Sequence, residues 1–415
     1  MLIMASAIGK KTKQIAYLLA LVYFSSYFMR INFAVMMVKI CSDMQVEKSA
    51  LAIVVTGLTV AYGAGQVISG VLGDRIKPQY LITAGLSLAT LCNVCISLCT
   101  GIPAMTAVWC VNGFAHALLW PPIVRLLSTH LSDAEYSYAS VRVSWGSSVA
   151  TIVLYLLCPL LLGFLHWRAV ILTCAAWGAI ATVLWLILYP RLFRGASEER
   201  TSTQTEKADS PRMPLPRYAL FAVVLIMLGI IMQGMLRDGV TNWMPSYLLE
   251  TFGLSEESSI VSTVVLALFS ILSFSVSDLI HRKLFANEVT CAMAIFGVSA
   301  VSSLILYAVN VLCPDAALIP SLILMSLTVA CMHGINLMLI AIVPKAFVKC
   351  GRVSTYSGIL NACTYVGASI STYGFAAIAE QFDWNFTILT WIGISAIGLL
   401  LCALAAPIWK KFKAE

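Results

Sequence analysis

Long apolar segments follow one another almost from end to end of this 415-residue chain. A run of about 20 apolar residues is long enough to cross a membrane as a helix. The strands of a membrane barrel would instead alternate polar and apolar residues at every second position, which these segments do not do. We therefore expect an all-α polytopic membrane protein with twelve transmembrane helices, over residues 14–39, 50–72, 79–100, 104–127, 138–163, 168–189, 218–247, 258–280, 287–311, 316–343, 353–378 and 386–408.

One long polar segment interrupts this pattern after the sixth predicted helix. Residues 191–217 contain charged residues, Ser and Pro, a composition typical of a flexible linker. The sequence therefore predicts an N-terminal six-helix half (1–190), a cytoplasmic linker (191–217) and a C-terminal six-helix half (218–415).

The two halves share landmarks at nearly the same offset. Asp74 follows the second predicted helix and Asp278 lies at the end of the eighth, 204 positions later. Arg30 in the first helix has a counterpart in Arg237 of the seventh, 207 positions later. A duplicated six-helix unit, as in many transporters, would give two pseudo-symmetric halves of this kind.

Basic residues are unevenly divided between the two ends of the predicted helices. Of the 26 Lys and Arg, 21 fall on the side that would hold both termini, and only Lys39, Lys48 and Arg168 fall on the other. Because cytoplasmic loops carry an excess of Lys and Arg, we expect both termini in the cytoplasm and a bacterial inner (plasma) membrane location. The net charge of +7 then reflects topology and indicates no nucleic-acid partner.

Composition argues against enzymatic and metal chemistry. Hydrophobic residues make up 60% of the chain and charged residues 11%, against roughly 25% charged in soluble domains. The CNVCISLC segment (Cys92, Cys95, Cys99) has metal-like spacing, but cysteine within a membrane usually packs as a small apolar residue. No nucleophile–base set or carboxylate pair lies within the predicted helices. We expect no enzyme activity, no bound metal and no cofactor.

Arg30 lies inside a predicted helix, where a charged residue costs about 2.5–3.5 kcal/mol on insertion scales. Two structural explanations remain open: the side chain snorkels to the interface, or it pairs with a buried acid. No Asp or Glu lies within the first six predicted helices. Arg237 is next to Asp238, but adjacent helical residues point about 100° apart, so we expect no natural pair. Two arginines at equivalent positions of two repeats favour a site for an anion.

Polar residues recur along one face of several predicted helices. Tyr23, Tyr27 and Arg30 are spaced i, i+4 and i+7, which places them on one helix face. Tyr62 shares a face with Gln66, and Tyr365 shares one with Asn361. We expect these stripes to line a water-filled cavity, although a single tyrosine is equally typical of the membrane interface.

Several segments carry a resemblance to a known family. GVLGDRIK, containing Asp74 and Arg75, resembles the signature of the major facilitator superfamily. YFMRINFA, GLTVAYG, NGFAHALLWPPIVR, LRDGVTNWMPSYL and NACTYVGAS are similar to segments of the organophosphate:phosphate antiporters, which import glycerol 3-phosphate and hexose phosphates. The resemblance covers nearly the whole chain and implies the major facilitator fold.

The resemblance also implies roles for particular residues. The family's phosphate-binding arginines correspond to Arg30 and Arg237, its cavity tyrosines to Tyr23, Tyr27, Tyr62 and Tyr365, and a tryptophan to Trp120. Where the family has a lysine, a histidine and two tyrosines, this chain has Gln66, Ser147, His333 and Gly234. The resemblance therefore implies a retained phosphate clamp in a rebuilt pocket.

These observations together predict a transporter that imports an organic phosphate in exchange for inorganic phosphate, working as a monomer in the lipid bilayer. Asp74 and Arg75 are expected to act in a cytoplasmic gate, or else as a topological anchor. His333 is expected near the substrate, as a titrating group or a packed one, and Asp238 is a candidate for proton coupling. Two alternatives remain open: a proton-coupled importer of organic anions such as sugar acids, and a sugar-phosphate receptor that does not transport.

Overall fold

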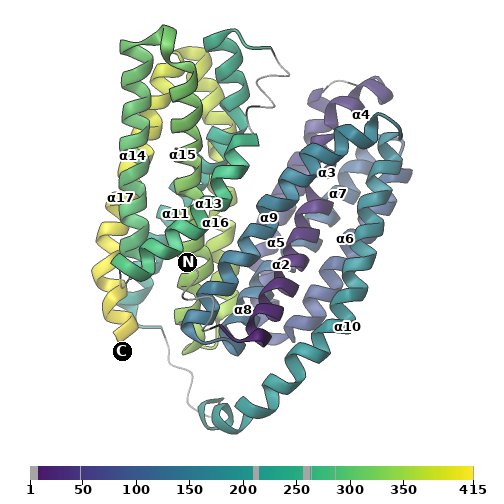
Figure 1. The fold of residues 1–415 in the computed structure, drawn as a ribbon, viewed down its shortest axis with the longest axis vertical. Helices are drawn as coiled ribbons and strands as arrows, with labels where there is room; N and C mark the ends of the chain where they lie inside the picture. Colours follow the sequence, from purple (N-terminus) through teal and green to yellow (C-terminus); the bar gives the residue numbers. More distant parts are fainter. Residues whose placement is uncertain are drawn as a thin grey trace. The chain divides into compact units, whose positions relative to one another are not determined.

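A computed structural model of the chain describes residues 8–46, 48–208, 215–255, 262, 264–285 and 287–414. The described residues form helices and connecting turns, with no strand among them (Figure 1). They divide into two compact units. Unit 1 is Met1–Pro214 with Phe347–Ile359, and unit 2 is Leu215–Ala346 with Leu360–Glu415.

Most of unit 1 consists of the helices coloured purple to teal in Figure 1. They are α2 (Lys10–Arg30), α3 (Asn32–Val35), α4 (Met37–Met44), α5 (Lys48–Arg75), α6 (Pro78–Leu98), α7 (Ile102–Ala117), α8 (Trp120–His130), α9 (Asp133–Leu162) and α10 (Trp167–Ala208). Helix α2 packs on α9 and α10, α5 packs on α7, and α6 packs on α7 and α10. Phe33, Trp109 and Trp167 are fully buried in the core between these helices.

Unit 2 contains the helices in green to yellow in Figure 1. They are α11 (Arg217–Phe252), α13 (Val264–Leu284), α14 (Glu288–Leu312), η1 (Pro314–Ala316), α15 (Leu318–Asn336), the π-helical η2 (Leu337–Ile342), the 3₁₀ segment η3 (Val343–Val348) and α17 (Trp384–Ala414). The last two residues of η3 belong to unit 1, and helix α16 (Val353–Gln381) begins in unit 1 and continues in unit 2.

The helix pairs of unit 2 repeat those of unit 1. Helix α13 packs on α15 as α5 packs on α7, α14 packs on α15 and α17 as α6 packs on α7 and α10, and α11 packs on α17 as α2 packs on α10. Equivalent helices therefore make equivalent contacts, as a duplicated six-helix unit requires.

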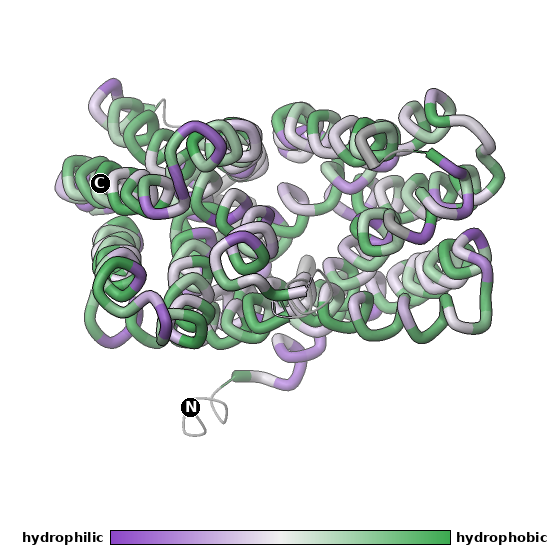
Figure 2. The backbone as a smooth tube through the Cα atoms, turned by 90° about the horizontal axis from the view of Figure 1, so that it is seen from above, coloured by the Kyte–Doolittle hydropathy of each residue, from purple (hydrophilic) through white to green (hydrophobic). Residues whose placement is uncertain are grey.

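Ten helical segments of the described chain are long and apolar enough to cross a membrane. Helices α2 and α16 complete the twelve spans of the predicted fold. In both helices Tyr, Ser and Thr interrupt the apolar residues. Figure 2 shows hydrophobic positions along most of the helical backbone, with hydrophilic positions scattered among them. The chain is a multi-pass membrane protein.

The expected flexible linker differs from the structure in its first part. Helix α10 continues to Ala208, so residues 191–208 are helical, and 209–214 lie outside the described residues. The prediction of a flexible linker rested on the charged residues and Ser of this segment. Ala, Glu, Arg, Gln and Lys are nevertheless good helix formers, and they extend a helix that has already begun in the preceding apolar segment.

Candidate functional site

Arg30 is the last residue of α2, directly before a break in the helix. The chain turns at Ile31 and resumes as α3 at Asn32. A helix end leaves carbonyl groups without intrahelical partners, and here buried amides supply them. Asn93 Nδ2 and Asn112 Nδ2 donate to the Met29 carbonyl, at 3.0 and 3.3 Å.

The break is held in place by a further buried amide pair. Asn32 Nδ2 donates to Asn93 Oδ1 at 2.8 Å, and Asn32 Oδ1 accepts from the Phe33 backbone N–H at 2.8 Å. Because these amides are buried and bonded to one another, they hold the chain direction on both sides of Arg30. The position of this arginine is therefore defined by α6 and α7 as well as by α2.

The Arg30 guanidinium lies against two tyrosine rings. Its Cζ is 4.0 Å from the ring centroid of Tyr27 and 4.6 Å from that of Tyr62. A guanidinium stacked on ring faces keeps its charge and its planar set of N–H donors. The stripe predicted from the sequence thus brings Arg30 together with tyrosines of α2 and α5.

Tyr23 extends this aromatic group toward α8. Its ring centroid lies 5.2 Å from that of Tyr27 and 5.0 Å from that of Trp120. Trp120 begins α8, where Pro121 and Pro122 occupy the first helical turn, a position at which proline needs no N–H partner. The indole Nε1 of Trp120 is buried and has no hydrogen-bond acceptor among the described residues. Such a donor is available for a ligand oxygen.

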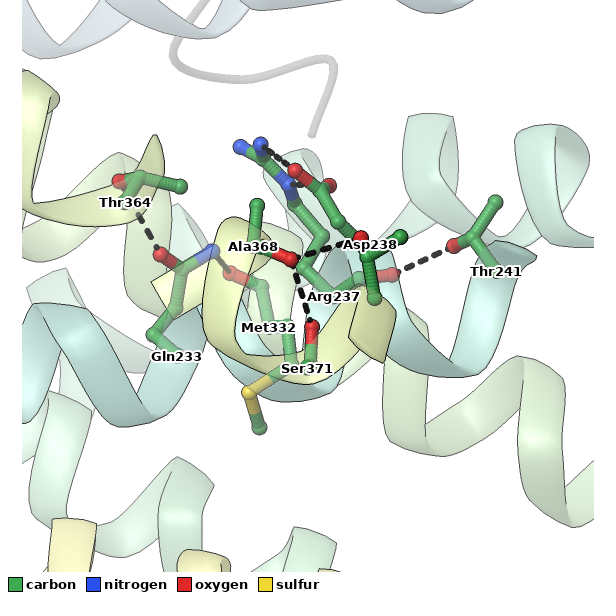
Figure 3. A network of polar contacts seen from close by, with 9 residues as sticks. Gln233, Arg237, Asp238, Thr241, Met332, Thr364, Ala368 and Ser371 are labelled. Atoms are coloured by element: carbon green, nitrogen blue, oxygen red, sulfur yellow. Dashed lines mark hydrogen bonds and ion pairs between the residues drawn. The ribbon is translucent and has the colours of Figure 1, made fainter. Parts of the chain in front are cut away.

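Arg237 in α11 pairs with its neighbour Asp238. The Nε and Nη2 atoms donate to the two carboxylate oxygens at 2.6 and 2.9 Å (Figure 3). The expectation that the adjacent residues would not pair is wrong. The helix does separate their Cβ directions, but the long arginine side chain folds back across that angle and reaches the carboxylate in a planar, two-bond arrangement.

Arg237 is positioned by close packing between α11 and α16. Gly234 lies against the backbone of Thr364, such that a methyl group at position 234 would lie 2.9 Å from the Thr364 Cα. Gln233, which is fully buried, donates from Nε2 to the Met332 carbonyl at 3.1 Å and accepts from Thr364 Oγ1 at 3.4 Å (Figure 3). These contacts join α11, α15 and α16 one turn before Arg237.

Tyr365 and His333 are the other predicted site residues of unit 2. The Tyr365 ring centroid is 6.0 Å from the Arg237 Cζ, so the two residues lie together as expected. His333 packs edge-to-face on Phe274, with centroids 5.5 Å apart, within electrostatic range of Arg237 and Asp238. The ring contact favours the packed role among the two considered for His333.

Asp74 caps the start of α16 within unit 1. Its Oδ1 accepts from the Ser354 N–H at 2.9 Å, and its Oδ2 accepts from the Thr355 N–H at 2.9 Å and the Thr355 hydroxyl at 2.6 Å. A carboxylate at a helix N-terminus satisfies free N–H groups and complements the helix dipole. Glycines allow the close approach, since a methyl group at Gly70 would lie 2.7 Å from the Ser354 carbonyl oxygen.

Arg125, rather than Arg75, forms hydrogen bonds with the backbone next to Asp74. Arg125 Nη1 donates to the carbonyls of Gly73 and Ile76 at the end of α5, whereas Arg75 is exposed. The counterpart Asp278 forms an ion pair with Arg282, one turn away on α13. The two aspartates therefore have different partners in the two units.

The sequence did not predict several residues near the site, among them His116, Gln233 and Arg125. His116 Nδ1 lies 3.0 Å from Ser26 Oγ, within electrostatic range of Arg30. No pattern in the sequence marks Gln233 or Arg125, because each is a single polar residue without a periodic or paired partner. No group of three or more His, Cys, Asp and Glu side chains in the described part of the chain is arranged to hold a metal.

A family model for the Major Facilitator Superfamily matches residues 19–372. The chain belongs to the Major Facilitator Superfamily. This family consists of membrane transport proteins, so the expectation that the chain is not an enzyme is confirmed.

Curated relatives confirm the resemblance to the organophosphate:phosphate antiporters. The chain is 24% identical to "Probable hexose phosphate transport protein" of Chlamydia trachomatis over 62% of its own length and 61% of the relative's. It is 24% identical to "Glycerol-3-phosphate transporter" of Bacillus subtilis, over 92% of the chain and 89% of the relative. It is 22% identical to "Membrane sensor protein UhpC" of Escherichia coli, over 90% and 88%.

The fold matches a solved major facilitator structure. The proton:xylose symporter XylE superposes with a TM-score of 0.72 at 14% sequence identity, covering 94% of each chain. The predicted twelve-helix major facilitator fold is therefore confirmed. At this identity the likeness concerns the fold only.

Proposed function

We propose that the protein is a secondary transporter that imports an organic phosphate, of the sugar-phosphate or glycerol-phosphate type, in exchange for inorganic phosphate. The observation that carries this proposal is the pair of arginines, one in each unit, each accompanied by tyrosine. Arg30 stacks on Tyr27 and Tyr62, and Arg237 lies near Tyr365. The names of the hexose-phosphate and glycerol-3-phosphate relatives support the same substrate class.

A phosphoryl group is the ligand that suits these side chains. The guanidinium presents a planar fork of N–H donors that matches phosphate oxygens, and it keeps its charge at any working pH. In the proposal, one phosphoryl group is bound by both arginines during alternating access. The bound phosphate would thereby stabilise the intermediate between the two facing states, and an empty site would reach that intermediate less readily.

We propose exchange as the transport mode of this arrangement. Asp238 offsets the charge of Arg237 in the empty site, so a bound phosphate would have to replace this carboxylate. Gln66, where the family has lysine, lowers the positive charge of the proposed pocket by one. We therefore propose a preference for less charged or larger phosphate esters.

Gating and topology belong to the same proposal. Asp74 would hold the start of α16 in one facing state and release it in the other, with exposed Arg75 as an interaction partner during the change. Both termini would lie in the cytoplasm of a bacterial cell, as the distribution of Lys and Arg indicates. The proposed working form is a monomer in the bacterial inner (plasma) membrane.

The Arg237–Asp238 pair favours one second candidate function. A proton that neutralises Asp238 would remove the negative charge that pairs with Arg237 and make the guanidinium available to an anion. The protein would then import an organic anion together with a proton. In this case uptake would require a proton gradient and would not require phosphate on the opposite side.

Phosphate self-exchange tests the proposal directly. Purified protein is placed in liposomes loaded with unlabelled phosphate, and the uptake of labelled phosphate is followed. We expect saturable uptake that depends on internal phosphate and that sugar phosphates inhibit. Uptake abolished by an uncoupler, without dependence on internal phosphate, would support the proton-coupled candidate. Phosphate binding without any uptake by folded protein would support a sensor.

Arg30→Lys and Arg237→Lys test the clamp itself. Each keeps the charge and loses the planar fork, which removes at least one charge-assisted hydrogen bond of about 1.5–3 kcal/mol. Each 1.4 kcal/mol is a tenfold change in binding, so we expect exchange to fall by about tenfold or more. Arg191→Lys, at an exposed position of α10, is the matched control. Near-wild-type exchange in both test variants would contradict the clamp.

A further inference from the structure

Arg142 is another arginine within a helix of unit 1, and the proposed clamp does not account for it. It is the tenth residue of α9 (Asp133–Leu162), about 13 Å along the axis from the start of the helix. None of the ion pairs among the described residues includes Arg142. A charge at this depth is costly unless it finds a partner or reaches the membrane interface.

Aromatic side chains of the same helix enclose the guanidinium. The Arg142 Cζ lies 3.6 Å from the ring centroid of Tyr138, one turn earlier, and 5.0 Å from the ring of Trp145, three residues later. Its Nη1 donates to the Tyr138 carbonyl at 3.2 Å. The side chain therefore leans toward the N-terminal end of α9, the direction in which helical side chains point.

Several donors of this cluster have no acceptor. Arg142 Nε and Trp145 Nε1 are buried and have no hydrogen-bond partner in the described chain. The aromatic contacts stabilise the positive charge but do not neutralise it. The guanidinium is hydrogen-bonded to Tyr138, through its carbonyl and its side chain, and neither partner is an acid. A cation with unused N–H donors, held between an indole and a phenol, has the chemistry of a phosphate-binding site.

The cluster is well separated from Arg30. Tyr17 of α2 lies beside Tyr138, and Tyr17 is 13 residues before Arg30, about 20 Å along the helix axis. At this end α2 carries Lys10, Lys11 and Lys13, and Thr12 donates to Glu135 at the start of α9. The cluster thus belongs to the basic end of unit 1.

The surroundings match those of a membrane interface. Tyr17 is 57% exposed, and Tyr and Trp side chains concentrate at the level of lipid headgroups. Basic pockets between helices on the cytoplasmic side are suited to anionic headgroups. We infer that Arg142, Tyr138 and Trp145 form a second phosphate-binding site, which takes the phosphate of an anionic lipid headgroup or a free phosphate ion.

Thermal unfolding of the purified, delipidated protein tests this inference. The probes are a short-chain phosphatidylglycerol, the matching phosphatidylcholine and inorganic phosphate. We expect phosphatidylglycerol to raise the Tm of the wild type more than phosphatidylcholine does, and Arg142→Gln to lose most of that difference. Arg191→Gln, which removes an exposed arginine of α10, is expected to keep it.

The two sources of phosphate give different results. If the site binds a lipid headgroup, Arg142→Gln no longer shows the Tm increase caused by phosphatidylglycerol. It still shows the Tm increase caused by inorganic phosphate, because that ion binds at the clamp through Arg30. A site for free phosphate shows a reduced inorganic-phosphate effect in Arg142→Gln. Equal Tm shifts in the wild type and Arg142→Gln with all probes would overturn the inference.

A second variant guards against misfolding of the first. Trp145→Phe keeps the aromatic packing and removes the Nε1 donor. We expect the wild type to show a change in tryptophan fluorescence on addition of the bound probe that Trp145→Phe lacks. No difference between the two proteins would also overturn the inference. Neither measurement depends on transport, so their outcome is separable from that of the exchange assay.

Discussion

Arg237 meets both oxygens of Asp238, and this pair determines how an anion could reach the guanidinium. A phosphate must share the N–H donors with the carboxylate or replace it. The side chains of Arg237 and Asp238 are 13% and 26% exposed, so the pair is only partly screened by solvent. The carboxylate thus acts as a built-in competitor of the proposed substrate.

Asp238→Asn tests this competition. The variant removes the negative charge beside Arg237, so we expect inorganic phosphate to bind more tightly, by about tenfold for a loss of roughly 1.4 kcal/mol of competing interaction. Calorimetric titration of the purified protein measures the change in Kd. Phosphate exchange should persist if the protein is an antiporter. Unchanged affinity would show that the carboxylate does not compete, and loss of proton-driven uptake would support the proton-coupled candidate.

At the residue scale the sequence predicted the aromatic surroundings of Arg30 but not all of its support. Helical spacing placed Tyr23 and Tyr27 on the face of Arg30, and this depends only on the helix repeat. The contributions of Asn93 and Asn112 could not be predicted, because they come from helices far away in the sequence. Their role arises only where the Met29 carbonyl has lost its helical partner.

At the element scale, helix breaks and close helix crossings position the candidate residues. Helix α2 ends at Arg30, and α8 begins anew at Trp120 with two prolines in its first turn. Helices α11 and α16 cross closely where Gly234 faces Thr364 and Gly367 faces Ile231. Any larger side chain at Gly234, including the tyrosine of the related family, would require a different crossing.

Gly234→Ala tests the importance of this crossing. The added methyl group would meet backbone atoms of Thr364, which cannot rotate away, and overpacking of this kind costs about 1–3 kcal/mol. We expect a lower Tm and slower exchange. Gly374→Ala, also in a helix but with open space around the position, is the control and should unfold at the wild-type Tm. Equal Tm values for both variants would contradict the assigned packing role.

At the scale of the whole molecule, α16 is divided between the two units. Residues Phe347–Ile359 belong to unit 1, and the chain from Leu360 belongs to unit 2. Asp74 is one of the residues that join the start of α16 to unit 1, since its carboxylate accepts hydrogen bonds from the N–H groups of Ser354 and Thr355. A change in this cap should therefore alter the start of α16 more than the rest of the helix.

Asp74→Ala tests the cap by hydrogen exchange. Loss of an N-capping side chain costs about 0.5–2 kcal/mol, so we expect faster amide exchange in a peptide covering residues 353–359. The matched control is Asp278→Ala, because Asp278 pairs with Arg282 within α13 and should leave that peptide unaffected. Unchanged exchange of residues 353–359 in Asp74→Ala would show that the aspartate does not hold α16.

The sequence by itself determined the membrane class, the twelve spans and the positions of the two arginines. These features depend on apolar length and helical spacing, which are local properties of the chain. Only the tertiary structure decided which partners those arginines have, how Gly234 brings two helices together and where Asp74 finds its N–H groups. Each of these contacts depends on how far a side chain reaches or on how closely distant segments approach. The spacing of residues along one helix predicts neither of these properties.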